Sequence, residues 1–131
     1  MRHKDELKQD ALINATVKLV NEIGFVASSV AKIAKEAQVS PATVYIYYKN
    51  KEDLLVSTYV YIKQHMARQI LSDLDLDEPV RDVFKQIWYN MFNYVSQNSA
   101  RFQFAEQFGN SPFTDLVDKS KVEEPFLPAV K

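Results

Sequence analysis

The chain has 131 residues, with 16 Lys and Arg against 17 Asp and Glu, and a formal net charge of −1. It contains no cysteine, which excludes disulfide bonds, a thiolate metal site and a cysteine nucleophile. The charged N-terminus lacks the apolar region of a signal peptide, and no run approaches the roughly 20 apolar residues of a membrane-spanning helix, so we expect a cytoplasmic protein without membrane segments.

The first part of the chain predicts two helices. Apolar residues recur at three- and four-residue spacing and only two glycines occur, a pattern typical of an all-α fold. The first helix is expected over residues 5–23, with Gly24 ending it as a left-handed residue. Ser28 or Ser29 then caps a short helix that ends at about Ala37.

A turn and another short helix follow. The turn is the three-residue segment Gln38-Val39-Ser40. Ser40 followed by Pro41 indicates a helix start, because the hydroxyl caps the helix and proline at the first position lacks an N–H that would have no partner there. We expect this helix to end at about Tyr48, with Val44 and Tyr48 facing inward.

Longer helices make up the rest of the chain. Asn50 with Asp53 resembles a capping box that opens a helix over residues 51–73. Its buried stripe is expected to consist of Leu55, Tyr59, Ile62, Met66 and Ile70.

Three more helices are expected beyond an acidic break at residues 75–79. The first ends at about Gln97, the second begins at Asn98 or Ser99 and ends at Gly109, and the third begins near Lys119. The inward face of the first is expected to carry Val80, Phe84, Ile87, Met91 and Val95.

Two short helices joined by a three-residue turn with a buried aliphatic residue, Val39, predict a helix-turn-helix. In this motif the second helix enters the DNA major groove. Its outward residues here are small, hydroxylated or flat, which suits close approach to base edges. Lys51 lies in the first turn of its helix, where a cation opposes the helix dipole unless a phosphate occupies the site. The charge balance agrees weakly, since residues 1–65 carry +2 and residues 66–131 carry −3.

The stretch VAKIAKEAQVSPATVYIYYKNKEDLL, from Val30 to Leu55, resembles the head of the tetracycline-repressor (TetR) family of regulators. The resemblance implies a homodimer of all-helical subunits. It also implies a head (1–50) that binds double-stranded operator DNA, and a body (51–131) that dimerises and binds an effector, with helix 51–73 connecting them. By position, the DNA-contacting residues are Ser29, Ser40, Pro41, Ala42, Thr43, Tyr45, Tyr47 and Lys51.

Three positions depart from the family pattern. Gln38 replaces the usual glycine of the turn, so either its backbone is right-handed or it bears a modest left-handed strain. Ala42 replaces a glycine of the recognition helix, and Tyr48 replaces a buried phenylalanine. Family members usually continue for two further long helices, so we expect that the chain is a truncated or incomplete form.

Aromatic residues in the body could line an effector pocket, form ordinary core, or cover a dimer or body surface. The preferred pocket residues are Trp88, Phe92, Phe104 and Phe108. The apolar aromatic side chains of these four residues favour a small apolar or amphipathic effector.

The sequence favours no catalytic or cofactor site. His3 and His65 are lone histidines without a second ligand at metal spacing, so no metal site is expected. There is no pairing of a nucleophile with a base and no glycine loop to hold phosphate, so we expect no enzyme activity. Two functions stay open: a ligand-responsive repressor that binds a pseudo-palindromic operator as a dimer, and a co-regulator of the same fold that works through a protein partner.

Overall fold

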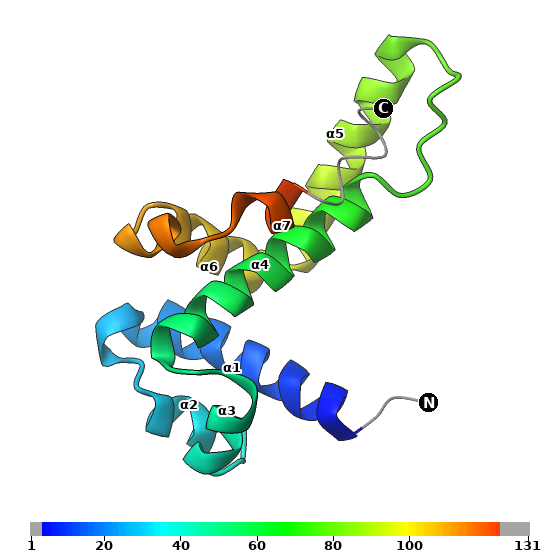
Figure 1. The fold of residues 1–131 in the computed structure, drawn as a ribbon. Coiled ribbons are helices and arrows are strands. Elements are labelled where there is room, and N and C mark those ends of the chain that lie inside the picture. Colours follow the sequence, from blue (N-terminus) through cyan, green and yellow to red (C-terminus); the bar gives the residue numbers. More distant parts are fainter. Residues whose placement is uncertain (1–3, 124–131) are drawn as a thin grey trace.

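The computed structural model describes residues 4–123, which form seven α-helices and one 3-10 helix (Figure 1). These residues contain no strand, so the all-α prediction is confirmed. His3 lies outside the described part. The elements are α1 (Lys4–Ala27), α2 (Val30–Glu36), α3 (Pro41–Tyr47), α4 (Lys51–Ile70), α5 (Val80–Gln97), α6 (Ser99–Gly109), η1 (Pro112–Leu116) and α7 (Lys119–Glu123).

Gly24 interrupts α1 as expected, although in a different conformation. Its φ of 85° is positive, but its ψ of 173° lies outside the left-handed helical region. This combination is open mainly to glycine, which has no Cβ to clash. One further turn of α1 continues to Ala27, and the Ser28 hydroxyl donates to the Gly24 carbonyl at 2.6 Å.

The head forms around the first of two apolar cores. Helices α1, α2 and α3 enclose this core together with the start of α4, at the bottom of Figure 1. The predicted three-helix head with a helix-turn-helix is therefore confirmed. Its buried residues are Leu12, Ala15, Val30, Ile33, Ala34, Val44 and Leu54.

The body forms around the second core, which is rich in aromatic rings. Helix α6 lies against both α1 and α4, and η1 covers its end. The buried residues are Val17, Val20, Leu55, Ile62, Phe104, Ala105 and Phe108. Because α1 and α4 supply residues to both cores, the head and the body share two continuous helices.

Helix α4 ends three residues earlier than expected. It stops at Ile70, and Asp73 then adopts a φ of 60° that breaks the helical path. The expected stripe is confirmed at Leu55, Ile62 and Ile70. Tyr59 and Met66 are half-buried instead, and the list of buried residues also contains Leu54, Thr58 and Ala67.

The expected inward face of α5 is wrong, although its bounds are confirmed. Val80 and Phe84 are 70% and 66% exposed, and Met91 is also exposed. The N-terminal half of α5 projects beyond the rest of the molecule, beside the end of α4 (Figure 1). The helix is held by Tyr94, which is buried, and by Asn90, whose amide donates to the Ile70 carbonyl at 2.8 Å.

Two further observations concern membrane-spanning helices and metal sites. None of the helices within residues 4–123 combines the length and apolar character needed to cross a membrane. The same residues hold no group of three or more His, Asp or Glu side chains placed to bind a metal ion.

Candidate nucleic-acid interface

The two helices of the motif begin at serine caps. The Ser29 hydroxyl accepts a hydrogen bond from the Lys32 backbone N–H at 3.2 Å, and Ser40 does the same for Thr43 at 3.2 Å. Each cap satisfies an amide that would otherwise lack an intrahelical partner. Ser29 is therefore the N-cap of α2 in the free protein.

The turn between α2 and α3 is tight and left-handed at one residue. Gln38 has a φ of 61°, which settles the alternative left open by the sequence. The Val39 N–H donates to the Ala34 carbonyl at 2.9 Å and closes the turn. A residue other than glycine bears a modest strain there, on the order of 1 kcal/mol. The turn fixes the direction in which α3 leaves α2.

Packing beneath α3 determines which of its faces is free. Val44 is 1% exposed and packs against Ile33 and Ala34 of α2, while Tyr48 is half-buried beside the same core. The opposite face carries exposed Pro41, Ala42, Tyr45 and Ile46, with Ile46 76% exposed.

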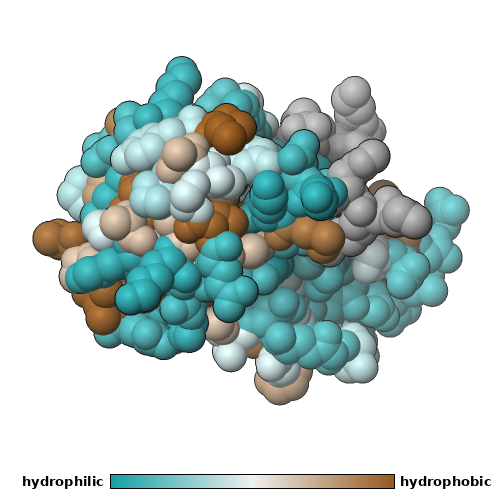
Figure 2. All heavy atoms as spheres, turned by 90° about the horizontal axis from the view of Figure 1, so that it is seen from below, coloured by the Kyte–Doolittle hydropathy of each residue, from teal (hydrophilic) through white to brown (hydrophobic). Residues whose placement is uncertain are grey.

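Figure 2 views this side of the molecule, where hydrophilic residues cover most of the surface and hydrophobic ones project between them. An exposed helix face with small and apolar side chains, set among polar neighbours, has the character of a surface that approaches base edges and thymine methyl groups.

Thr43 is preorganised by the cap of its own helix. Its hydroxyl lies 3.0 Å from the Ser40 hydroxyl, and the side chain is half-buried. The two hydroxyls restrict each other's rotamers, so a partner on the DNA would meet groups that are already oriented.

Tyr47 is hydrogen bonded to a residue in the first turn of α1. Its hydroxyl donates to a carboxylate oxygen of Asp5 at 2.8 Å. This hydrogen bond raises the pKa of Tyr47, so the phenol stays protonated and remains a donor near neutral pH. Asp5 therefore places a negative charge at the end of α3, through a contact across 42 residues for which the sequence pattern gives no signal.

Lys51 opens α4 beside the end of α1. Its ammonium donates to the Val26 carbonyl at 3.3 Å, and the Asn50 side chain caps the helix through the Asp53 N–H at 2.8 Å. The Asp53 carboxylate reaches back to the Lys49 N–H at 2.9 Å, so the expected capping box exists in a form shifted by one residue. Lys51 thus places a cation at the N-terminus of α4, beside the last turn of α1.

The eight predicted contact residues lie at one end of the molecule, at the N-cap of α2, along α3 and at the start of α4. The four predicted pocket residues, in contrast, are not brought together. Trp88 and Phe92 are 73% and 68% exposed on α5. Phe104 and Phe108 are fully buried in the body core. No single cavity among those described within residues 4–123 is lined by both pairs.

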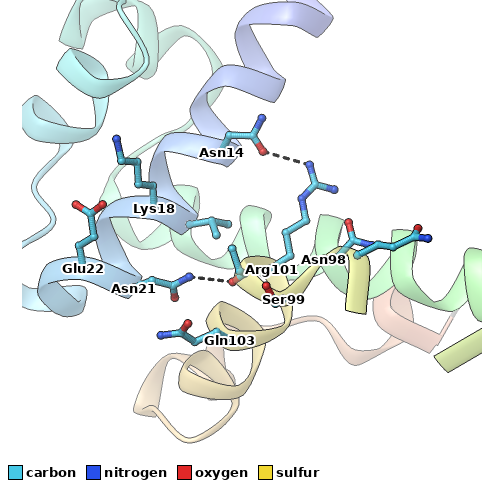
Figure 3. Close-up of a pocket in the computed structure, with 11 residues that line it drawn as sticks. Asn14, Lys18, Asn21, Glu22, Asn98, Ser99, Arg101 and Gln103 are labelled. Atoms are coloured by element: carbon cyan, nitrogen blue, oxygen red, sulfur yellow. Dashed lines mark hydrogen bonds between the residues drawn. The ribbon is translucent and has the colours of Figure 1, made fainter. Parts of the chain in front are cut away.

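A polar junction joins the head to the body. Asn14 accepts a hydrogen bond from the Arg101 guanidinium at 3.2 Å, and the Asn21 amide donates to the Ala100 carbonyl at 2.9 Å (Figure 3). Gln107 donates to Asn21 at 2.9 Å. The contacts of Arg101 and Ala100 lie along a cleft of about 570 Å³ between α1 and the start of α6. Sequence reasoning missed this junction, because no local pattern links residues almost 90 positions apart.

Known proteins share both the motif and the fold. The family model described as "Bacterial regulatory proteins, tetR family" matches residues 12–58. A TetR family transcription regulator from Marinobacter aquaeolei is 32% identical, with 99% of this chain and 68% of that chain covered and a TM-score of 0.87. An uncharacterized HTH-type transcriptional regulator of Haemophilus influenzae is 27% identical over 113 residues, which cover 86% of this chain and 60% of that protein.

A second solved structure resembles the chain in fold alone. The transcriptional regulator FadR of Bacillus subtilis, solved in complex with stearoyl-CoA, is 24% identical with a TM-score of 0.68. The match covers 92% of this chain and 63% of that one.

Proposed function

This chain belongs to the TetR family of bacterial regulatory proteins, and we propose that it is a ligand-responsive repressor that binds a pseudo-palindromic operator as a homodimer. The observation that carries the DNA-binding part is the outward face of α3. Its capped N-terminus and exposed Ala42, Tyr45 and Ile46 leave it free to enter a major groove. Such a regulator acts in the cytoplasm, where bacterial DNA lies, and performs no catalysis.

A small effector is supported by the chain's similarity to FadR, whose structure contains stearoyl-CoA. We infer that this protein responds to an apolar or amphipathic molecule bound in the body. The polar junction between α1 and α6 supports a route for the response, because a shift of α6 would move α1 and the head with it. The co-regulator alternative requires no effector and predicts a stable protein partner instead.

Removal of the Lys51 charge tests the interface. We expect Lys51→Ala to weaken binding to all DNA sequences and to lower the slope of log K against log salt by about 1, because one phosphate contact is lost. The measurement is fluorescence anisotropy with labelled operator and random duplexes over a salt series. Lys85→Ala removes an equally charged, exposed side chain on α5 and serves as the control.

Equal salt slopes for the Lys51 and Lys85 variants would contradict the proposed interface. Absence of any salt-dependent retention of the parent protein on DNA, together with a co-purifying protein, would favour the co-regulator instead.

The Asp5 carboxylate beside Tyr47 leads to a second prediction. Asp5→Asn keeps an oxygen acceptor for the Tyr47 hydroxyl but removes a negative charge from the DNA-facing end of the head. We expect tighter DNA binding, by about 1 kcal/mol or less at low salt, because one repulsion with phosphate disappears. Titration of the parent and the variant at two salt concentrations checks this gain, which should shrink at the higher one. An unchanged affinity at both concentrations would place Asp5 outside the interface.

A further inference from the structure

Two buried polar atoms in the body have no hydrogen-bond partner among residues 4–123. The first is the hydroxyl of Tyr94, whose side chain is 2% exposed. The second is Nδ1 of His65 on α4. A buried polar group without a partner is destabilising, so natural proteins rarely keep one without a function or an unseen bonding group. Both atoms belong to the same part of the body.

The rings of His65 and Tyr94 lie close to each other, and Tyr61 beside them contacts the guanidinium of Arg101. The His65 ring lies between Tyr61 and Tyr94, with ring centroids 5.9 Å and 6.3 Å away. The guanidinium of Arg101 lies 5.5 Å from the centroid of the Tyr61 ring. We refer to Tyr61, His65, Tyr94 and Arg101, which come from α4, α5 and α6, as the Tyr94 cluster.

The charges of the cluster are not balanced. Arg101 is half-buried and hydrogen bonds to the neutral Asn14. The ion pair described within residues 4–123 joins Lys18 to Glu36 and does not involve Arg101. Burial lowers the pKa of His65, and the cations Arg101 and Arg68 lower it further. His65 is therefore neutral near pH 7, and one of its ring nitrogens can donate a hydrogen bond. The cluster offers a cation and hydrogen-bond donors without an anion to receive them.

We propose that the Tyr94 cluster binds the carboxylate of a small amphipathic acid. Arg101 supplies the charge, and the Tyr94 hydroxyl and the His65 imidazole donate hydrogen bonds to the oxygens. A single half-buried cation matches a monoanion better than a phosphate dianion, and the surrounding aromatic rings favour a ligand with an apolar tail. This inference rests on the proposed ligand response and names the chemical class of the effector.

Arg101 connects the Tyr94 cluster to the cleft between α1 and α6, and it also hydrogen bonds to α1. This residue is half-buried and also lines the cleft between α1 and α6 (Figure 3). A carboxylate that engages the guanidinium competes with Asn14, which is one of the residues through which α1 contacts α6. Ligand binding therefore weakens a contact that positions the head.

Octanoate is the probe for the test, with octanol and inorganic phosphate as matched ligands that lack the charge or the tail. We expect octanoate to raise the melting temperature of the full chain by several degrees, and the other two to have little effect. Tyr94→Phe should raise the melting temperature of the ligand-free protein, since it removes a buried hydroxyl without a partner, and should weaken octanoate binding at least tenfold by calorimetry. Arg101→Gln should weaken octanoate binding to a similar degree.

Tyr89→Phe, which alters a tyrosine of α5 that is 60% exposed, is the control and should change neither quantity. Equal octanoate binding by the Tyr94 and Tyr89 variants would overturn the proposal. So would an absence of octanoate binding, or equal stabilisation by phosphate. The assay contains no DNA, so octanoate binding by a protein that fails to bind DNA would refute the proposed function and leave this inference intact.

Discussion

Replacement of Phe108 by alanine is expected to lower the free energy of unfolding by about 3–5 kcal/mol. The side chain is fully buried at the centre of the body core. Its ring lies 4.4 Å from that of Tyr59, measured between centroids, and 6.1 Å from that of Phe104. It also contacts Phe25 and Phe113 at 6.2 Å. Alanine would leave a cavity bordered by four aromatic rings, which cannot collapse without moving several helices.

The loss is large compared with the whole stability of a typical domain, which is about 5–15 kcal/mol. Urea unfolding followed by circular dichroism measures it. Phe92→Ala is the matched control, since it makes the same substitution at a side chain that is 68% exposed, and its effect should stay within about 0.5 kcal/mol. If Phe108→Ala and Phe92→Ala lower the free energy of unfolding by amounts that agree within about 1 kcal/mol, Phe108 does not hold the body together.

The head could be predicted from sequence because the signals that form it are local. Ser29 and Ser40 each accept a hydrogen bond from an amide three residues ahead, and Pro41 fits the first turn without losing a bond. Donor and acceptor are close in the chain, so the residue pattern alone identifies both helix starts. Gln38 stayed ambiguous because the strain of a left-handed glutamine is small enough for either conformation.

The face of α5 could not be predicted in the same way. Apolar periodicity indicates that a helix has an apolar side, but it does not indicate which elements cover that side. Val80 and Phe84 fit the period but lie where α5 projects from the molecule. The helix is instead attached through the polar Asn90, which donates to the carbonyls of Ile70 and Ser72 at 2.8 and 3.3 Å.

Contacts between distant residues were also beyond the sequence pattern. The bond from Tyr47 to Asp5 and the bond from Arg101 to Asn14 each join segments that only the complete fold brings together. The aromatic residues of the body illustrate the same limit. Their composition favours both a core and a pocket, and only packing distinguishes the buried Phe104 from the exposed Trp88.

Replacement of Ala42 by glutamate is expected to abolish specific DNA binding while leaving the fold intact. Ala42 is exposed at the second position of α3, on the face proposed to enter the major groove. A carboxylate there would meet base edges and flanking phosphates, and a juxtaposition of like charges costs several kcal/mol, so affinity should fall on the order of 100-fold or more. The same carboxylate interacts favourably with the helix dipole, so the stability of the head should not decrease.

Val80→Glu provides a control of the same kind. Val80 is 70% exposed at the first position of α5, so the substitution places the same carboxylate in the first turn of a helix away from α3. Operator titration of both variants should separate them by about two orders of magnitude in Kd, with melting temperatures within a few degrees of the parent. If the Ala42 variant binds operator as tightly as the Val80 variant, α3 does not enter the groove by this face. DNA recognition would then have to be assigned to another surface of the head.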